Sequence, residues 1–195
     1  MGWLCNKVVK QKTVEELVAE KSVGMTDGQK AQYWWELSQN IFALLGKVDV
    51  TILEISPQEW IAVAQVQYPT LTDVKIADSK FFTTSLQGLQ EILSHDWTNL
   101  VPFAASTGDC DKFATRLYSH LCDYYKVTAV IPVWGDTTQG YHGFNLAVLK
   151  SDDTWIARLI EPQTDLIFVD QGPLGKYVPR VLATELGVLK SKLTQ

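Results

Sequence analysis

The sequence predicts an α+β fold, and three observations lead to that prediction. The N-terminal half carries apolar residues with helical periodicity, an amphipathic helix begins at Cys110, and alternating apolar segments fill residues 127–169. Helices followed by a run of consecutive strands are typical of α+β proteins. We therefore expect a helical N-terminal region over residues 1–79, in the same domain or as a subdomain, and the main core over residues 80–195.

Composition limits the function classes. The chain has 195 residues, 46% of them hydrophobic and 7 of them Trp, which is enough to build a sizeable core. The net charge of −5 comes without a basic stripe, so we expect no nucleic-acid partner. Residues 1–7 lack the apolar run of a signal peptide, and no segment is apolar enough to span a membrane. We therefore expect neither secretion by a signal peptide nor a membrane partner.

The cysteines indicate a reducing compartment. There are three of them, Cys5, Cys110 and Cys122, and an odd number at wide spacing is not a disulfide framework. Cys110 and Cys122 lie on one predicted helix, about 18 Å apart at 1.5 Å per residue, so they cannot form a disulfide with each other.

Three helices are predicted before residue 70. Thr13 opens the first as a capping residue, and the second runs over residues 28–45 after a turn at 26–28. Ser56 caps the third, with Pro57 at its first position, and this helix ends before residues 68–69. Residues 48–55 alternate like a half-buried strand or an extended linker.

The second half begins with a short strand over residues 73–77 and a helix over 84–93. The Cys110 helix follows, with Phe113, Leu117 and Leu121 on one face. Four strands are then predicted, over residues 127–134, 141–149, 154–160 and 166–169. The second and third form a hairpin around a turn at 151–153.

Cys110 is the residue of most interest for chemistry. A cysteine in the first turn of a helix faces unpaired N–H groups and the positive end of the helix dipole, which stabilise its thiolate. The alternative is a small buried residue at a helix start, because free cysteines are among the most buried residues.

A histidine and a carboxylate follow Cys110 in a suggestive order. His142 opens one strand of the predicted hairpin and Glu161 closes the other, so the hairpin places them side by side. Thiol catalysis needs an imidazole to take the proton and an acceptor to orient the imidazole. The backbone N–H of Cys110 could supply half of an oxyanion hole. We expect His95 and His120 to be structural.

Three fragments resemble a known family. They are Asp109-Cys110-Asp111-x-Phe113-Ala114, His142-Gly143-Phe144-Asn145 and Ile160-Glu161-Pro162-Gln163-Thr164-Asp165. Over residues 80–170 they look like the papain-like/transglutaminase-like cysteine enzymes, closest to the C-terminal protease domain of the fairy-ring mushroom agglutinin and to related uncharacterised bacterial and phage proteins. The resemblance implies a papain-like core, with Cys110 as nucleophile, His142 as base and Glu161 as orienting acid. It also implies a Ca²⁺ ion held by Asp111 and Gln163, whose oxygens suit a hard cation.

Some of these residues depart from the pattern or have a simpler explanation. Lys112 stands where a second acidic residue is expected, which weakens the case for metal, and Gly143 replaces a more usual alanine, a change expected to matter less. Asp109 is explained by helix capping, and Asp111 by the helix dipole.

The resulting hypothesis is a calcium-dependent cysteine hydrolase that cleaves a peptide or amide bond of a protein substrate through a Cys110–His142–Glu161 triad. The resemblance leaves two alternatives open: a transglutaminase-type amide transferase, and a non-catalytic metal-binding or assembly protein, such as a phage or virion accessory protein. The expected location is cytoplasmic or virion-associated.

Overall fold

The computed structural model describes residues 23–30, 32–33, 36, 48–76, 78–100 and 110–183. The chain divides into two compact units, Met1–Gly46 and Lys47–Gln195. The predicted helix at Thr13, most of the helix predicted over 28–45, and the proposed capping residue Asp109 lie outside the described residues. Within the described part of the chain, no helix is both long and apolar enough to cross a membrane.

In the first unit, a helix starts after a reciprocal cap. The Gln29 N–H donates to Thr26 Oγ1 over 3.4 Å, while the Thr26 N–H donates to Gln29 Oε1 over 2.9 Å. Each side chain thus satisfies an N–H group that the first helical turn would leave unpaired.

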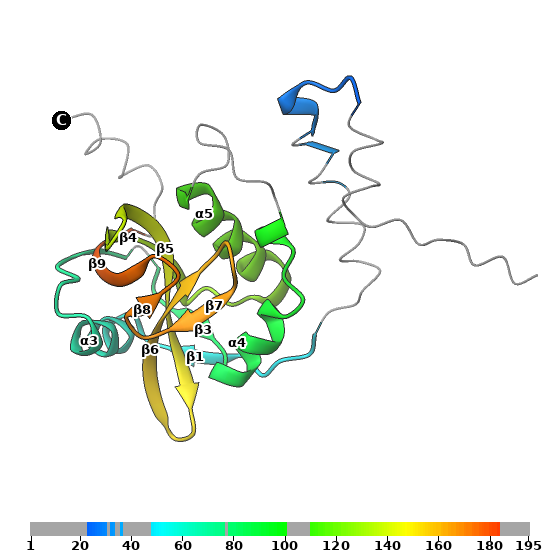
Figure 1. Cartoon of the computed structure of the whole chain (residues 1–195). Helices are drawn as coiled ribbons and strands as arrows, with labels where there is room; N and C mark the ends of the chain where they lie inside the picture. Colours follow the sequence, from blue (N-terminus) through cyan, green and yellow to red (C-terminus); the bar gives the residue numbers. More distant parts are fainter. Residues whose placement is uncertain are drawn as a thin grey trace, which may run out of the picture. The chain divides into compact units, whose positions relative to one another are not determined.

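The second unit contains the helices and strands that build the site (Figure 1). In chain order these are β1 (Leu53–Ile55), α3 (Pro57–Gln67), β2 (Asp73–Lys75), β3 (Phe81–Thr83), α4 (Leu86–Leu93), the 3₁₀ turn η1 (Thr98–Leu100), α5 (Cys110–His120), the π-helical turn η2 (Leu121–Tyr125), β4 (Val130–Thr137), β5 (Gly140–Ser151), β6 (Thr154–Glu161), β7 (Leu166–Phe168), β8 (Gln171–Gly172) and β9 (Gly175–Ala183).

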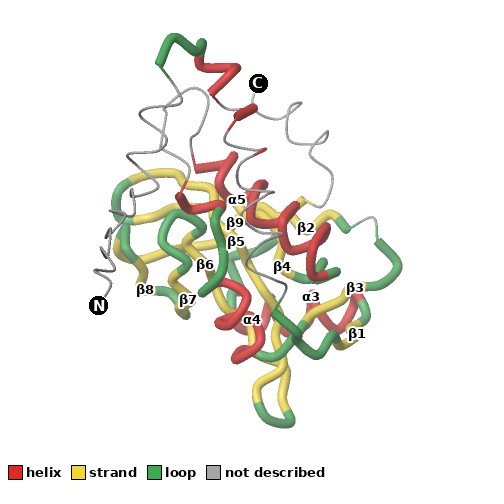
Figure 2. The backbone as a smooth tube through the Cα atoms, turned by 90° about the vertical axis from the view of Figure 1, so that its right-hand side faces the viewer, coloured by secondary structure: helices red, strands yellow, loops and turns green. Residues whose placement is uncertain are grey.

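A mixed seven-stranded sheet is the centre of this unit. Its order is β2-β9-β4-β5-β6-β7, and β8 pairs with β9. The β2–β9 pair is parallel and the other pairs are antiparallel. The β5–β6 hairpin extends beyond the rest of the sheet in both backbone views (Figures 1 and 2). β1 and β3 form a separate two-stranded sheet.

Local sequence signals account for the helix starts. The Ser56 hydroxyl accepts the Glu59 N–H over 3.2 Å and Pro57 is the first residue of α3, as predicted. Ser85 caps α4 by accepting the Gly88 N–H over 2.9 Å. Each cap satisfies an N–H group that the helix cannot pair internally.

Helices cover both faces of β5. Phe144, Leu146 and Val148 join the main core cluster together with Trp60 and Ala64 of α3. Between them, Asn145 reaches the other face, where its Nδ2 donates to the Ala114 carbonyl of α5 over 2.9 Å. Because successive side chains of a strand alternate between faces, α3 and α5 enclose the strand that carries His142.

This arrangement corrects the predicted fold class, which was α+β with a papain-like core and a helical N-terminal region. The described chain is mainly β and is built on the mixed sheet, with few helices. The prediction missed β9, which pairs with β4 on one side and with β2 on the other. Pro179 obscures the strand signal of β9, and a register shift in β4 at Trp134/Gly135 lies opposite this stretch.

Candidate functional site

The structure brings together the three residues that the sequence singled out. Cys110 is the first residue of α5 and is partly exposed, His142 lies near the start of β5, and Glu161 ends β6. His142 and Glu161 are 8% and 2% exposed. The Nε2 atom of His142 lies 2.8 Å from Glu161 Oε2. The start of one helix and the ends of two strands therefore meet at this site. The catalytic role of the three residues remains a prediction.

The surroundings of Cys110 favour its thiolate. A hydrogen bond with His142 lowers the pKa of the Cys110 thiol, and a hydrogen bond from the Gly143 N–H lowers it further. Partial burial and the charge of Asp111 act in the opposite direction but do not reverse the shift. A thiol with a lowered pKa exists as the nucleophilic thiolate at neutral pH more often than a free cysteine does.

His142 is held in its protonated form. Burial alone would lower its pKa, but hydrogen bonds with Cys110 and Glu161, together with their negative charges, raise the pKa to about 9. Because Nε2 faces Glu161, Nδ1 is the ring nitrogen left to face Cys110. Between the lowered pKa of Cys110 and about pH 9, the pair is therefore a thiolate beside an imidazolium.

Glu161 has more than one hydrogen-bond partner. Tyr177 on β9 donates its hydroxyl to Glu161 Oε2 over 2.7 Å, and the Gln163 N–H donates to Glu161 Oε1 over 3.3 Å. These donors compensate for the removal of the carboxylate from water. No sequence signal pointed to Tyr177, because β9 itself was not predicted.

The start of α5 lies very close to β5. A Cβ atom placed on Gly143 would lie 3.1 Å from Asp111 Cα and 3.2 Å from Asp111 N, closer than a side chain normally packs. Glycine thus allows the close approach that places the Gly143 N–H at Cys110. The change to glycine at this position was expected to matter less than the one at Lys112, and the packing shows that a side chain at Gly143 would crowd Asp111.

The predicted calcium ligands receive no support from their surroundings. Lys112 Nζ lies 3.7 Å from Asp111 Oδ1, so a cationic group already stands beside that carboxylate. The contact that Gln163 makes in the site comes from its backbone N–H, which donates to Glu161 Oε1. Among the described residues, no three His, Cys, Asp or Glu side chains form a group suited to a metal ion. Calcium binding by Asp111 and Gln163 remains a prediction, and no chemical step proposed below depends on it.

The other two histidines lie elsewhere. His120 is 3% exposed, with its Nε2 atom 3.7 Å from Asp96 Oδ1, and burial lowers its pKa. His95 is exposed, and its Nδ1 lies 3.1 Å from the Glu91 carbonyl. The structural roles expected for both remain predictions.

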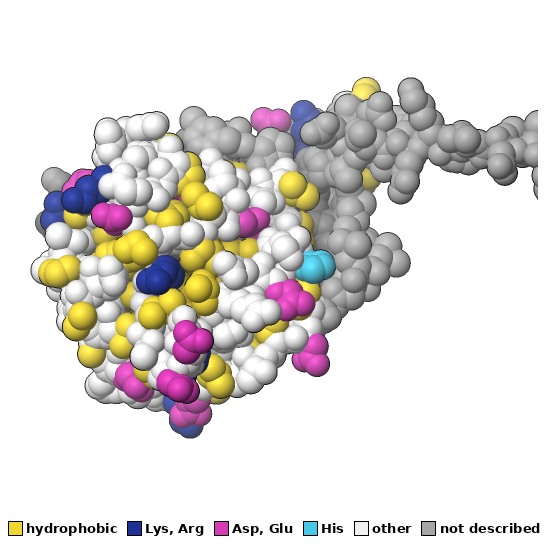
Figure 3. All heavy atoms as spheres, turned by 60° about the horizontal axis from the view of Figure 1, so that its bottom comes forward, with side chains coloured by type: hydrophobic (Ala, Val, Ile, Leu, Met, Phe, Trp, Pro, Cys, Tyr) yellow, Lys and Arg dark blue, Asp and Glu magenta, His cyan; other side chains and the backbone are white. Residues whose placement is uncertain are grey.

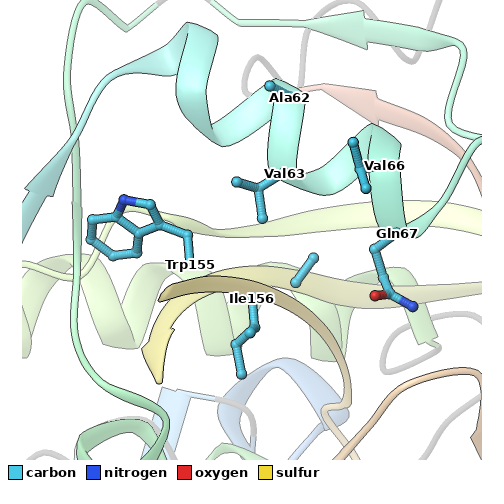
Figure 4. Close-up of a pocket in the computed structure, with 7 residues that line it drawn as sticks. Ala62, Val63, Val66, Gln67, Trp155 and Ile156 are labelled. Carbon is cyan, nitrogen blue, oxygen red and sulfur yellow. The ribbon is translucent and has the colours of Figure 1, made fainter. Parts of the chain in front are cut away.

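A separate apolar groove lies between α3 and β6 (Figure 4). It encloses about 310 Å³, and its lining residues are Ala62, Val63, Val66, Gln67, Trp155, Ile156 and Ala157. Val66 is 83% exposed. One face of the molecule shows several hydrophobic side chains among polar ones (Figure 3). The groove offers an indole ring and an amide to a ligand.

Comparison with solved structures shows a shared fold. The structure of a PSL1a–E64 complex matches with a TM-score of 0.53 and 18% identity over 66% of this chain. A structure of Polyporus squamosus lectin bound to a human-type influenza-binding epitope matches with a TM-score of 0.47 and 19% identity over 61% of this chain. The chain spans about half of each matched chain, 49% and 48%. No protein-family model and no curated protein sequence matches it.

These comparisons correct the family expected from the sequence. The structure that matches at a TM-score of 0.53 is named as a PSL1a–E64 complex and not as a papain-like protease. The predicted cysteine hydrolase rested on that family, so it is corrected together with the peptide substrate that it implied. Neither the transglutaminase nor the non-catalytic metal-binding or assembly alternative gains support. At these identities the likeness establishes the fold alone.

Proposed function

We propose that Cys110 is a reactive nucleophile that bonds covalently to an electrophilic carbon of a ligand, with His142 as its proton partner and Glu161 as the group that orients His142. The observation that supports this most strongly is the 2.8 Å contact between His142 Nε2 and Glu161 Oε2, on the imidazole that hydrogen-bonds Cys110.

The chemistry follows from the charges. The Cys110 thiolate attacks the electrophilic carbon and forms a C–S bond, while the bond from that carbon to its leaving heteroatom breaks. The heteroatom takes the proton of the His142 imidazolium, so charge and protons balance. The Glu161 carboxylate keeps the ring in the orientation that aims Nδ1 at the sulfur.

The first test is the rate of iodoacetamide labelling across pH 4 to 10, resolved by peptide mass spectrometry. We expect Cys110 to label with a midpoint well below the ordinary thiol value of about 8.5. Cys122 is an internal control, because burial raises its pKa to about 11. If Cys110 labels only with a midpoint near or above 8.5, the proposal is wrong.

E64, the compound in the matched PSL1a complex, is a second probe. It carries an epoxide, which a thiolate opens by attack at carbon while the ring oxygen takes a proton. We expect a mass increase of one E64 on Cys110 and none on Cys122.

A second candidate function is carbohydrate binding in the groove between α3 and β6. Two observations support it: the matched structures are those of a lectin, and the groove is lined by the Trp155 indole at one end and by Gln67 at the other (Figure 4). Aromatic rings pack against the apolar faces of ligands, and amides hydrogen-bond hydroxyl groups.

A glycan array, followed by calorimetry on any glycan that binds, tests this candidate. We expect Trp155→Ala to weaken binding by about tenfold or more, since a central aromatic contact contributes strongly to affinity. Phe82→Ala, which removes an aromatic residue 37% exposed on β3, is the matched control. The absence of glycan binding, or equal losses in the two variants, would count against a carbohydrate site in this groove.

A further inference from the structure

The orienting carboxylate depends on a strand that is distant in sequence. Glu161 is 2% exposed, and its Oε2 atom accepts hydrogen bonds from both His142 Nε2 and the Tyr177 hydroxyl. These two donors come from β5 and β9, while Glu161 ends β6. The position of the carboxylate is thus defined from three strands of the sheet.

Tyr177 is itself firmly held. It is 1% exposed, and its ring packs edge-on against Phe144 and Phe168, with centroid distances of 5.1 and 4.7 Å. The His142 ring lies 6.0 Å from the Tyr177 ring in a similar edge arrangement. A rigid aromatic ring fixes the direction of its hydroxyl, so the hydrogen bond to Glu161 is preorganised.

We infer that Tyr177 is a positioning residue of the proposed nucleophilic site, which keeps the Glu161 carboxylate aimed at His142. This inference rests on the proposed function and deepens it. Without the Tyr177 hydroxyl, Glu161 Oε2 keeps only one of these two donors, and the carboxylate is less firmly directed at His142. His142 then loses its oriented partner, and the thiolate–imidazolium pair weakens.

A role in packing alone would give a different result. The Tyr177→Phe variant retains the ring against Phe144 and Phe168, so a purely structural role predicts little change in labelling at any pH. A positioning role predicts slower labelling of Cys110 below the ordinary pKa of a thiol, where its thiolate depends on the imidazolium beside it. The shape of the pH profile therefore separates the two roles.

The experiment measures iodoacetamide labelling of Cys110 from pH 4 to 9 in wild type and in Tyr177→Phe. At pH 5 we expect Cys110 of the variant to label roughly fivefold more slowly than Cys110 of wild type, because hydrogen bonds to charged groups are among the stronger ones. The rise of its labelling rate with pH should therefore begin at a higher pH. At pH 8, close to the ordinary pKa of a free thiol, we expect the two rates to agree within about twofold.

Tyr68→Phe is the matched control. It removes another buried tyrosine hydroxyl, which donates to the Val169 carbonyl over 2.7 Å, and it should leave the labelling profile unchanged. In a Glu161→Gln background, Tyr177→Phe should cause no further shift, because the carboxylate that Tyr177 orients is absent.

The outcomes distinguish this inference from the function on which it rests. If wild-type Cys110 shows no labelling below its ordinary range, the proposed function fails. If wild type labels at low pH and Tyr177→Phe has the same profile, only the inference about Tyr177 fails. An equal shift in Tyr68→Phe would also overturn it, since the effect would then be a general result of losing a buried hydroxyl group.

Discussion

His142→Ala is expected to slow labelling of Cys110 by iodoacetamide at pH 6 by on the order of 100-fold. The hydrogen bond with His142 is the main cause of the lowered pKa of Cys110, and burial acts against it. Without the imidazole, burial and the charge of Asp111 raise the pKa of the thiol, so at pH 6 almost no thiolate remains. Peptide mass spectrometry measures this rate, with Cys122 as the reference within each sample.

Two carboxylate variants make this prediction specific. Glu161→Gln keeps the size of the side chain and removes its charge, so the pKa of His142 falls, and we expect labelling at pH 6 to slow by roughly 30-fold. Asp111→Asn removes a charge that raises the pKa of Cys110, so it should shift the labelling midpoint slightly to lower pH. Shifts in the same direction for both variants would contradict these roles, as would unchanged labelling in His142→Ala.

Trp60→Ala is expected to destabilise the second unit by about 4 kcal/mol. Trp60 is fully buried, its ring packs edge-on against Phe81 with centroids 5.9 Å apart, and its Nε1 donates to the Ala129 carbonyl over 3.0 Å. The substitution leaves a cavity between α3 and the sheet and an unsatisfied buried carbonyl group. Urea unfolding followed by circular dichroism measures the free energy of unfolding.

Val66→Ala is the control on the same helix. Val66 is 83% exposed, so its truncation should change the free energy of unfolding by no more than about 0.5 kcal/mol. The destabilisation caused by Trp60→Phe, which retains an aromatic ring, should lie between those of the two alanine variants. If Trp60→Ala lowers the free energy of unfolding no more than Val66→Ala does, α3 does not hold the sheet in the way described.

Much of the local structure was predictable from the sequence because its signals act over a few residues. Ser56 and Pro57 mark the start of α3 through a side-chain hydrogen bond and a preset backbone angle. The turn between β5 and β6 follows the prediction, with Asp152 in the left-handed region at φ 49°. Because that hairpin was predictable, so was the meeting of His142 and Glu161 at its open end.

The family expected from three short fragments was wrong because short fragments do not report which strands pair. The order of Cys110, His142 and Glu161 along the chain constrains the chemistry of the site more than it constrains the fold. The sheet that carries them depends on which strands pair across long separations in sequence. The parallel pairing of β2 with β9 has no local signal, so the mainly β architecture became visible only in the structure.

The sequence by itself determined the helix starts, the β5–β6 hairpin and the chemical identity of the candidate triad, since each depends on neighbours along the chain. Only the tertiary structure decided that Tyr177 of β9 reaches Glu161 and that Gly143 lets the backbone at Asp111 approach β5. These contacts join residues from separate elements, and their positions follow from packing around the shared core.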